Sequence, residues 1–327
     1  METRDTVRQV FRFEWRGAVV GMPAIFLLLL IGALSHFQVA ASIAAAAAFA
    51  VGFGATKRVR HRKLDAMLLT GTGMMIVSIL GTLVGRDPLL ELVLTMVMGG
   101  LCGALIRWDA ALWWVWLQII IAFLLAANYP GTLADGLHRA ALVTLGTGVQ
   151  IGMVWAIKRH IHTPVTASPR EKQLRSKDIW RHALRAAICI GVALAASRAV
   201  HITHEYWAPM TTMIILKPGL RDTALRGIER IGGTILGIVM ATGIIVVTGS
   251  PIVQVTAATV SAGLAFGLQQ ARYAVLATAI TATVVLMINV AGSGVLGADR
   301  DRLAATLLGG SVALVGAAIA PRRRGQL

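Results

Sequence analysis

The sequence predicts an all-α membrane protein with about twelve transmembrane helices, arranged as two parallel six-helix repeats. The first reason is composition: 56% of the residues are hydrophobic and only 14% are charged, which is too apolar for the surface of a soluble chain of 327 residues. The second is that apolar runs of membrane-spanning length recur between short polar loops. The third is that most basic residues gather in every second loop, which indicates an even number of spans.

The chain opens with residues 1–16, whose spaced arginines and apolar residues predict a cytoplasmic interfacial segment. Residues 17–157 form the first predicted half, a polar linker follows at 158–181, and residues 182–320 form the second half before a basic cytoplasmic tail at 321–327. The expected spans lie near 17–34, 39–54, 66–84, 88–106, 110–127, 135–157, 182–200, 205–217, 228–248, 252–268, 271–291 and 303–320.

The distribution of Lys and Arg predicts that both termini lie in the cytoplasm. Because six spans return the chain to the same side, the two halves are expected to be parallel repeats. Their sequences are weakly similar, since residues 52–54 match 217–219 and residues 71–73 match 232–234. Glycine pairs four residues apart predict close helix packing at 17 and 21, 81 and 85, 99 and 103, 148 and 152, 233 and 237, and 263 and 267.

The stretch 204–237 holds the densest polar chemistry of the chain. Its apolar run, 205–217, is too short to cross a hydrocarbon core of about 30 Å as a plain helix. Lys217-Pro218-Gly219 stops the run, because proline removes a backbone donor and glycine opens left-handed conformations. Interrupted apolar segments of this kind are typical of transporter substrate sites, where half-helix ends turn their dipoles toward the solute.

A second helix is expected to follow the break, capped by Asp222 or Thr223. Arg226, Arg230 and Thr234 then recur at helical spacing on one face, and two guanidinium groups one turn apart suit a carboxylate or phosphate. A purely structural interpretation is also open, in which these arginines anchor the helix at the cytoplasmic interface and pair with acidic neighbours.

An aromatic pair, Tyr206-Trp207, precedes the interrupted segment. The two rings could stack on or shield an aromatic substrate, or they could belong to an interfacial aromatic belt.

The run YWAPMTTMIILKP, followed by RDTALRGIERIGGTILG, resembles the signature of the fusaric acid resistance and aromatic acid exporter family of bacterial inner-membrane proteins. Plant aluminium-activated malate transporters are distant relatives of that family. The close similarity extends from Arg185 to about Gly237. It implies a multi-pass protein of the bacterial inner membrane that exports small amphipathic organic anions such as aromatic carboxylates.

In this interpretation Arg226, Arg230 and Thr234 hold the carboxylate, Lys217 and Pro218 provide the half-helix end, and Tyr206 and Trp207 cover the ring. The proton gradient is the expected driving force, and a periplasmic adaptor is a candidate partner. Two alternatives stay open: a passive anion channel, as among the plant relatives, and a non-transporting membrane scaffold or subunit.

Two residues are candidates for proton coupling. Glu91 is a carboxylate inside the predicted span 88–106, and His204 lies in the outer loop beside Glu205. The alternatives are a solvated acid at the membrane interface for Glu91 and a solvated loop histidine for His204.

Several functional classes find no support in the sequence. There is no Walker-type glycine-rich loop, no His/Cys spacing for a metal, and no recognisable catalytic triad or nucleic-acid module. The net charge of +16 lies in loops between apolar runs, so we attribute it to membrane topology. Cys102 and Cys189 each lie in an apolar stretch and are expected to be core residues. The expectation is a non-enzymatic protein with no cofactor, no metal and no nucleic-acid partner, acting on its organic anion and on protons within the lipid bilayer.

Overall fold

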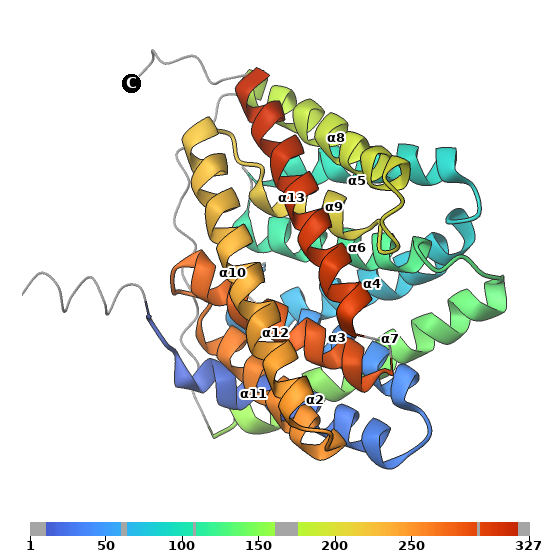
Figure 1. Ribbon diagram of the computed structural model, residues 1–327, viewed down its shortest axis with the longest axis vertical. Helices are drawn as coiled ribbons and strands as arrows, with labels where there is room; N and C mark the ends of the chain where they lie inside the picture. The colour runs from blue at the N-terminus through green and yellow to red at the C-terminus, as the bar shows by residue number, and fades with distance from the viewer. Residues whose placement is uncertain (1–10, 60–63, 107–108, 161–175, 293–294, 320–327) are drawn as a thin grey trace, which may run out of the picture. The chain divides into compact units, whose positions relative to one another are not determined.

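The computed structural model describes residues 11–59, 64–106, 109–160, 176–292 and 295–319 (Figure 1). The regular elements of these residues are twelve α-helices and one 3₁₀ helix, η1. They are α2 (Trp15–Leu34), α3 (Gln38–Gly52), η1 (Phe53–Thr56), α4 (Asp65–Val84), α5 (Pro88–Leu105), α6 (Ala110–Ala127), α7 (Leu133–Lys158), α8 (Ser176–Ala199), α9 (Trp207–Ile215), α10 (Leu220–Val247), α11 (Pro251–Gly267), α12 (Tyr273–Val290) and α13 (Val295–Ile319).

The structure confirms a helix at each of the twelve predicted positions within these described residues. Ten helices are long and apolar enough to cross a membrane: α2, α3 together with η1, α4, α5, α6, α7, α8, α10, α12 and α13. The chain is therefore a multi-pass membrane protein. The predicted count of about twelve spans is confirmed for ten, because α11 has 17 residues and α9 has only 9.

Helix starts follow from local capping chemistry. Asp87 precedes α5 and accepts hydrogen bonds from the backbone N–H groups of Leu89 and Leu90 at 3.0 and 3.1 Å, with Pro88 at the first helical position. Asp109 caps α6 in the same way, accepting from Ala111 N at 2.6 Å.

The chain divides into two compact units that alternate along the sequence. Unit 1 comprises residues 1–76, 137–167 and 232–299, and unit 2 comprises residues 77–136, 168–231 and 300–327. Unit 1 contains α2, α3, α11 and α12, whereas unit 2 contains α5, α6, α8 and α9. The other four helices, α4, α7, α10 and α13, contribute residues to both units. Each unit thus combines helices from both halves of the sequence.

In unit 1, α2 packs against α3 and α11, and an aromatic cluster lies between them. The ring centroid of Phe266 is 5.4 Å from that of Phe49 and 5.0 Å from that of Phe53, and all three side chains are buried. Glycine is required beside them, because a Cβ on Gly21 or Gly52 would overlap the Phe266 ring. The cluster fills its part of unit 1 with apolar volume.

Three amide side chains of unit 1 have hydrogen-bond partners within that unit. Gln150 donates its amide to Gly21 O at 3.1 Å. Asn289 donates to Gln254 Oε1 at 2.7 Å, and the Gln254 amide donates to Thr248 O at 3.1 Å. These bonds reduce the cost of placing amides in apolar surroundings.

Unit 2 is built around the contact between α5 and α8. A Cβ on Gly99 would lie 2.5 Å from the Ile190 side chain, and one on Gly103 would lie 2.9 Å from Ala186. The corresponding glycines of α11 in unit 1, Gly263 and Gly267, face α2 and the residue Phe13 that precedes it. Small residues therefore allow close approach of helices in both units.

A second glycine contact also occurs once in each unit. A Cβ on Gly81 of α4 would lie 2.6 Å from the carbonyl oxygen of Phe123 in α6. A Cβ on Gly233 of α10 would lie 2.6 Å from the carbonyl oxygen of Ala274 in α12. Gly85 and Gly237, one turn further on, face the carbonyl oxygens of Ala127 and Thr278 in the same two helices.

Five of the six predicted glycine pairs thus face a neighbouring element. The pair in α7, Gly148 and Gly152, does not, because a Cβ on either residue would meet no described atom within 4 Å. The packing role predicted for this pair is wrong for the described residues.

Candidate functional site

The candidate site is organised around α9, the nine-residue helix of unit 2. Its residues are almost all buried, and it packs against α5, α6 and α8. Thr212 also donates its hydroxyl proton to Gly309 O of α13 at 3.0 Å. The helix ends at Ile215, Leu216 is extended (φ −64°, ψ 116°), and α10 begins at Leu220. The predicted interruption at residues 217–219 is therefore confirmed.

Protein groups bind the backbone of this break. Arg185 of α8 donates through Nη2 to the carbonyl oxygens of Lys217 at 2.9 Å and Pro218 at 3.3 Å. Thr223 accepts a hydrogen bond from Lys217 N at 3.0 Å and donates its own hydroxyl proton to Gly219 O at 2.8 Å. An irregular backbone at membrane depth is stable only with such partners.

The structure changes two expectations about the break between α9 and α10. Thr223 lies inside α10, which begins at Leu220, so the predicted helix start at residue 222 or 223 is wrong. Thr223 instead ties the break to the first turn of the helix. Arg185 was not predicted as a site residue, because its link to the break joins residues more than thirty positions apart.

The side chain of Lys217 extends toward α6, where its Nζ lies 4.6 Å from the ring centroid of Trp113. His182 Nδ1 lies 2.9 Å from Arg185 Nη2. Since arginine can only donate, Nδ1 accepts, and the neutral His182 ring carries its proton on Nε2.

The predicted arginines lie on the first turns of α10. Arg230 is only 3% exposed and Arg226 is half-buried, and both belong to unit 2. The predicted face is confirmed, since Arg230, Thr234 and Gly237 are buried at helical spacing; Thr234 falls in unit 1. A Cβ on Gly227 would lie 3.7 Å from the Ile215 side chain, so the first turns of α10 lie against the end of α9.

The other end of α9 carries an ion-pair network. Arg198 of α8 pairs with Glu91 of α5, binds Glu205 through Nε at 2.6 Å, and donates through Nη1 to Pro88 O at 3.1 Å. Glu91 is only 4% exposed, so its interpretation as a solvated acid is wrong. Through Arg198, Glu91 is connected to Glu205, the residue that follows His204.

His204 belongs to an adjoining aromatic stack. Its ring lies over Trp207 with centroids 4.7 Å apart and planes 17° apart, and its Nδ1 is 3.3 Å from Asp301 Oδ2 of α13. The Arg302 guanidinium lies 5.1 Å from the Trp207 ring centroid and is itself 3% exposed. His204 is therefore a partly buried, paired histidine rather than a solvated loop residue.

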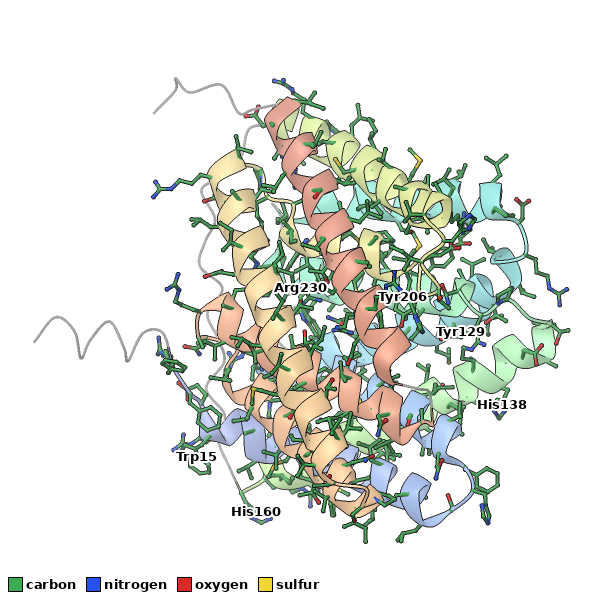
Figure 2. The ribbon with its side chains drawn as sticks, viewed as in Figure 1. Trp15, Tyr129, His138, His160, Tyr206 and Arg230 are labelled. Atoms are coloured by element: carbon green, nitrogen blue, oxygen red, sulfur yellow. The ribbon has the colours of Figure 1, made fainter. Side chains whose placement is uncertain are left out.

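Tyr206 completes the stack, with its ring centroid 5.4 Å from that of Trp207. Figure 2 labels Tyr206 and Tyr129, which both belong to unit 2. Tyr206 precedes α9, outside the ten candidate spans, and its burial, reinforced by Tyr129, raises the pKa of its phenol far above the usual value. Tyr206 and Trp207 are 8% and 2% exposed, so the alternative of an interfacial belt in contact with lipid is wrong for both rings.

Sequence reasoning missed Arg302, which it assigned to an outer loop. The last span was predicted to begin at residue 303, whereas α13 begins at Val295 and includes Arg302. A signal was present, because Arg302, Thr306, Gly309 and Ala313 recur at helical spacing and form one buried face.

Comparison with known proteins places the similarity in the second half of the chain. Residues 190–316 match the family described as fusaric acid resistance protein-like. The chain is 28% identical over 137 residues to ORF2, an uncharacterized protein of Neisseria gonorrhoeae. The aligned residues make up 41% of this chain and 32% of that protein. No solved structure matches.

Two further relatives are larger. An uncharacterized protein of Haemophilus influenzae is 28% identical over 134 residues, and the inner membrane protein YccS of Escherichia coli is 29% identical over 137 residues. Each similarity covers 41% of this chain and 19% of the relative, so the similar region spans about a fifth to a third of these proteins. The resemblance predicted from the sequence is confirmed: residues 190–316, which include all of α9 to α12, are a fusaric acid resistance protein-like segment of a multi-pass membrane protein.

Proposed function

We propose that this chain is a secondary transporter of the bacterial inner membrane that exports small amphipathic organic anions, such as aromatic carboxylates, using the proton gradient. The observation that carries the proposal is the buried Arg230, which lies one turn from Arg226 on α10. This spanning helix follows the short helix α9 and the break after it. The family match and the location named for the E. coli relative, an inner membrane protein, agree with it.

The energetic argument concerns the cost of these cations. An ionised side chain within a membrane helix is costly, so such residues are rare and usually functional. A carboxylate ligand would lower this cost by forming charge-assisted, bidentate hydrogen bonds with a guanidinium group. The same positive charge disfavours cations and discriminates against neutral solutes of similar shape.

Each predicted site residue receives a role in this proposal. Arg226 and Arg230 bind the carboxylate, and Thr234 offers a hydroxyl one turn further along α10. Lys217 and Pro218 form the half-helix end. Tyr206 and Trp207 lie at the start of α9, the end opposite to the break, and we assign them to shielding that end; direct stacking is disfavoured because His204 and Arg302 already lie against the Trp207 ring.

Proton coupling is assigned to the network at the start of α9. Protonation of Glu91 would weaken its pair with Arg198, and protonation of His204 would strengthen its pair with Asp301. Both changes affect residues that adjoin the loop between α8 and α9. Proton binding could therefore shift the position of α9 relative to its neighbours within unit 2.

The fold of the proposed transporter consists of two parallel six-helix repeats, α2–α7 and α8–α13. The paired glycine contacts support this proposal, because Gly81 of α4 and Gly85 just after it face α6 as Gly233 and Gly237 of α10 face α12. Matching these pairs places Ser78 opposite Arg230. This matching of the glycine pairs takes the place of the alignment between residues 71–73 and residues 232–234. The two stretches differ in their contacts, because Gly71 faces Thr147 whereas a Cβ on Gly232 would meet no described atom within 4 Å. The predicted cytoplasmic termini and a periplasmic adaptor belong to the same proposal.

The decisive experiment measures uptake of labelled p-hydroxybenzoate into inside-out membrane vesicles, with and without an imposed proton gradient. We expect gradient-dependent accumulation, and its loss in the double variant Arg226→Gln/Arg230→Gln at equal expression. Arg221→Gln is the matched control, because Arg221 is exposed on the same helix. Equilibration without accumulation would indicate a channel instead, and absence of flux would favour the scaffold. Full transport by the double variant would show that Arg226 and Arg230 do not form the substrate site.

A further inference from the structure

The two units can be compared position by position through their shared glycine contacts. Gly309 of α13 lies against the carbonyl oxygen of Ala208 in α9, and Gly146 of α7 lies against that of Ala44 in α3. Counting along α3 and α9 from these contacts places Phe53 of unit 1 opposite Lys217 of unit 2. Both residues stand where the regular α-helix has just ended.

The contacts of α5 and α11 complete the comparison. Gly99 and Gly103 of α5 face α8, and Gly263 and Gly267 of α11 face α2 and the residue that precedes it. Matching these pairs places Cys102 opposite Phe266. In unit 1 the matched residues touch, since the Phe53 and Phe266 ring centroids are 5.0 Å apart. The same matching predicts that Cys102 lies beside Lys217 in unit 2.

The chemistry at this shared position differs between the units. Unit 1 holds phenylalanine rings, which supply apolar bulk and no charge. Unit 2 holds an ammonium group and a small thiol in their place, and the Trp113 ring lies beside the ammonium at 4.6 Å. Lys217 is half-buried, and a charge partly withdrawn from water is costly, so its presence where apolar residues would pack well indicates a function.

The charge at the break is reinforced by Arg185, which binds the Lys217 carbonyl oxygen. His182 contributes no positive charge, because its Nδ1 accepts from the guanidinium. The Arg185 and Lys217 side chains are both half-buried, which strengthens their field relative to that of surface cations.

We propose that Lys217, Arg185, Trp113 and Cys102 form a second anion site, at the end of α9, that binds the carboxylate of an aromatic acid before it reaches Arg226 and Arg230. The cations bind the carboxylate, Trp113 contacts the ring, and the small Cys102 leaves space that phenylalanine occupies in unit 1. The choice of ligand rests on the proposed function, whereas the location of the site does not.

The test measures equilibrium binding of labelled p-hydroxybenzoate to the purified full-length chain in detergent. Cys102→Phe introduces the bulk found in unit 1, and Lys217→Gln removes the charge. We expect each change to weaken binding about tenfold or more, as loss of a charge-assisted contact does. The matched controls are Leu101→Phe, on the exposed side of the same helix, and Arg221→Gln, an exposed cation near the break. Both should bind as the unmodified protein does.

A chemical measurement covers the case in which Cys102→Phe does not fold. In the Cys189→Ala protein, Cys102 is the only thiol, and we expect p-hydroxybenzoate to slow its reaction with N-ethylmaleimide severalfold. Unchanged reactivity, or normal binding by folded Cys102→Phe and Lys217→Gln, would overturn this site and leave Arg226 and Arg230 as the proposed one. No binding by the unmodified protein would overturn both proposals.

Discussion

Arg198 offers the sharpest energetic prediction, because its two carboxylate partners differ in burial. The Glu91 side chain is 5% exposed, whereas that of Glu205 is 33% exposed. Replacing Arg198 with glutamine leaves the Glu91 charge buried without its cation. Breaking a buried pair in this way costs about 3–5 kcal/mol. Glu205→Gln removes only the more exposed partner and should cost less than about 1 kcal/mol.

The assay is thermal unfolding of the purified protein in detergent at neutral pH. Unfolding is monitored by size-exclusion chromatography with fluorescence detection. We expect Arg198→Gln to lower the unfolding temperature clearly more than Glu205→Gln does. The double variant Glu91→Gln/Arg198→Gln should recover most of the loss, because it removes the stranded charge together with its partner. Equal losses in Arg198→Gln and Glu205→Gln, or no recovery in the double variant, would refute the assignment of Glu91 as a buried, charged partner.

Three further predictions test the packing and the stack. Gly233→Ala should destabilise the protein by about 1–3 kcal/mol, since its Cβ would lie 2.6 Å from a backbone oxygen. Gly243→Ala should not destabilise it, because a Cβ there would meet no described atom within 4 Å. Thermal unfolding compares the two variants. Thr212→Val should cost about 1 kcal/mol by removing its hydrogen bond to Gly309, while Thr256→Val, an exposed hydroxyl, should change the same measurement little. Asp301→Asn removes the anionic partner of His204 and should reduce gradient-driven transport of p-hydroxybenzoate in vesicles; unchanged transport would exclude the His204–Asp301 pair from proton coupling.

The sequence by itself located the twelve helices and the interruption after α9, although it did not give the starts of α10 and α13. Apolar runs reveal spanning helices because the bilayer admits no unsatisfied backbone, so their positions depend only on local composition. Pro218 and Gly219 end α9 for equally local reasons, and the 3.6-residue period placed Arg230 on the buried face of α10. Family resemblance was visible in the same stretch because its motif is contiguous.

Tertiary structure decided which side chains meet. Arg185 binds the carbonyl oxygens of the break, and Arg198 joins Glu91 to Glu205, across separations of up to about a hundred residues. Lipid-facing and protein-facing residues are equally apolar in a membrane helix, so composition alone does not reveal which helices pack together. Two features follow from that packing and could not be read from local sequence. One is the burial of Trp207 against His204 and Arg302. The other is that Lys217 and Cys102 of unit 2 match positions that hold phenylalanine in unit 1.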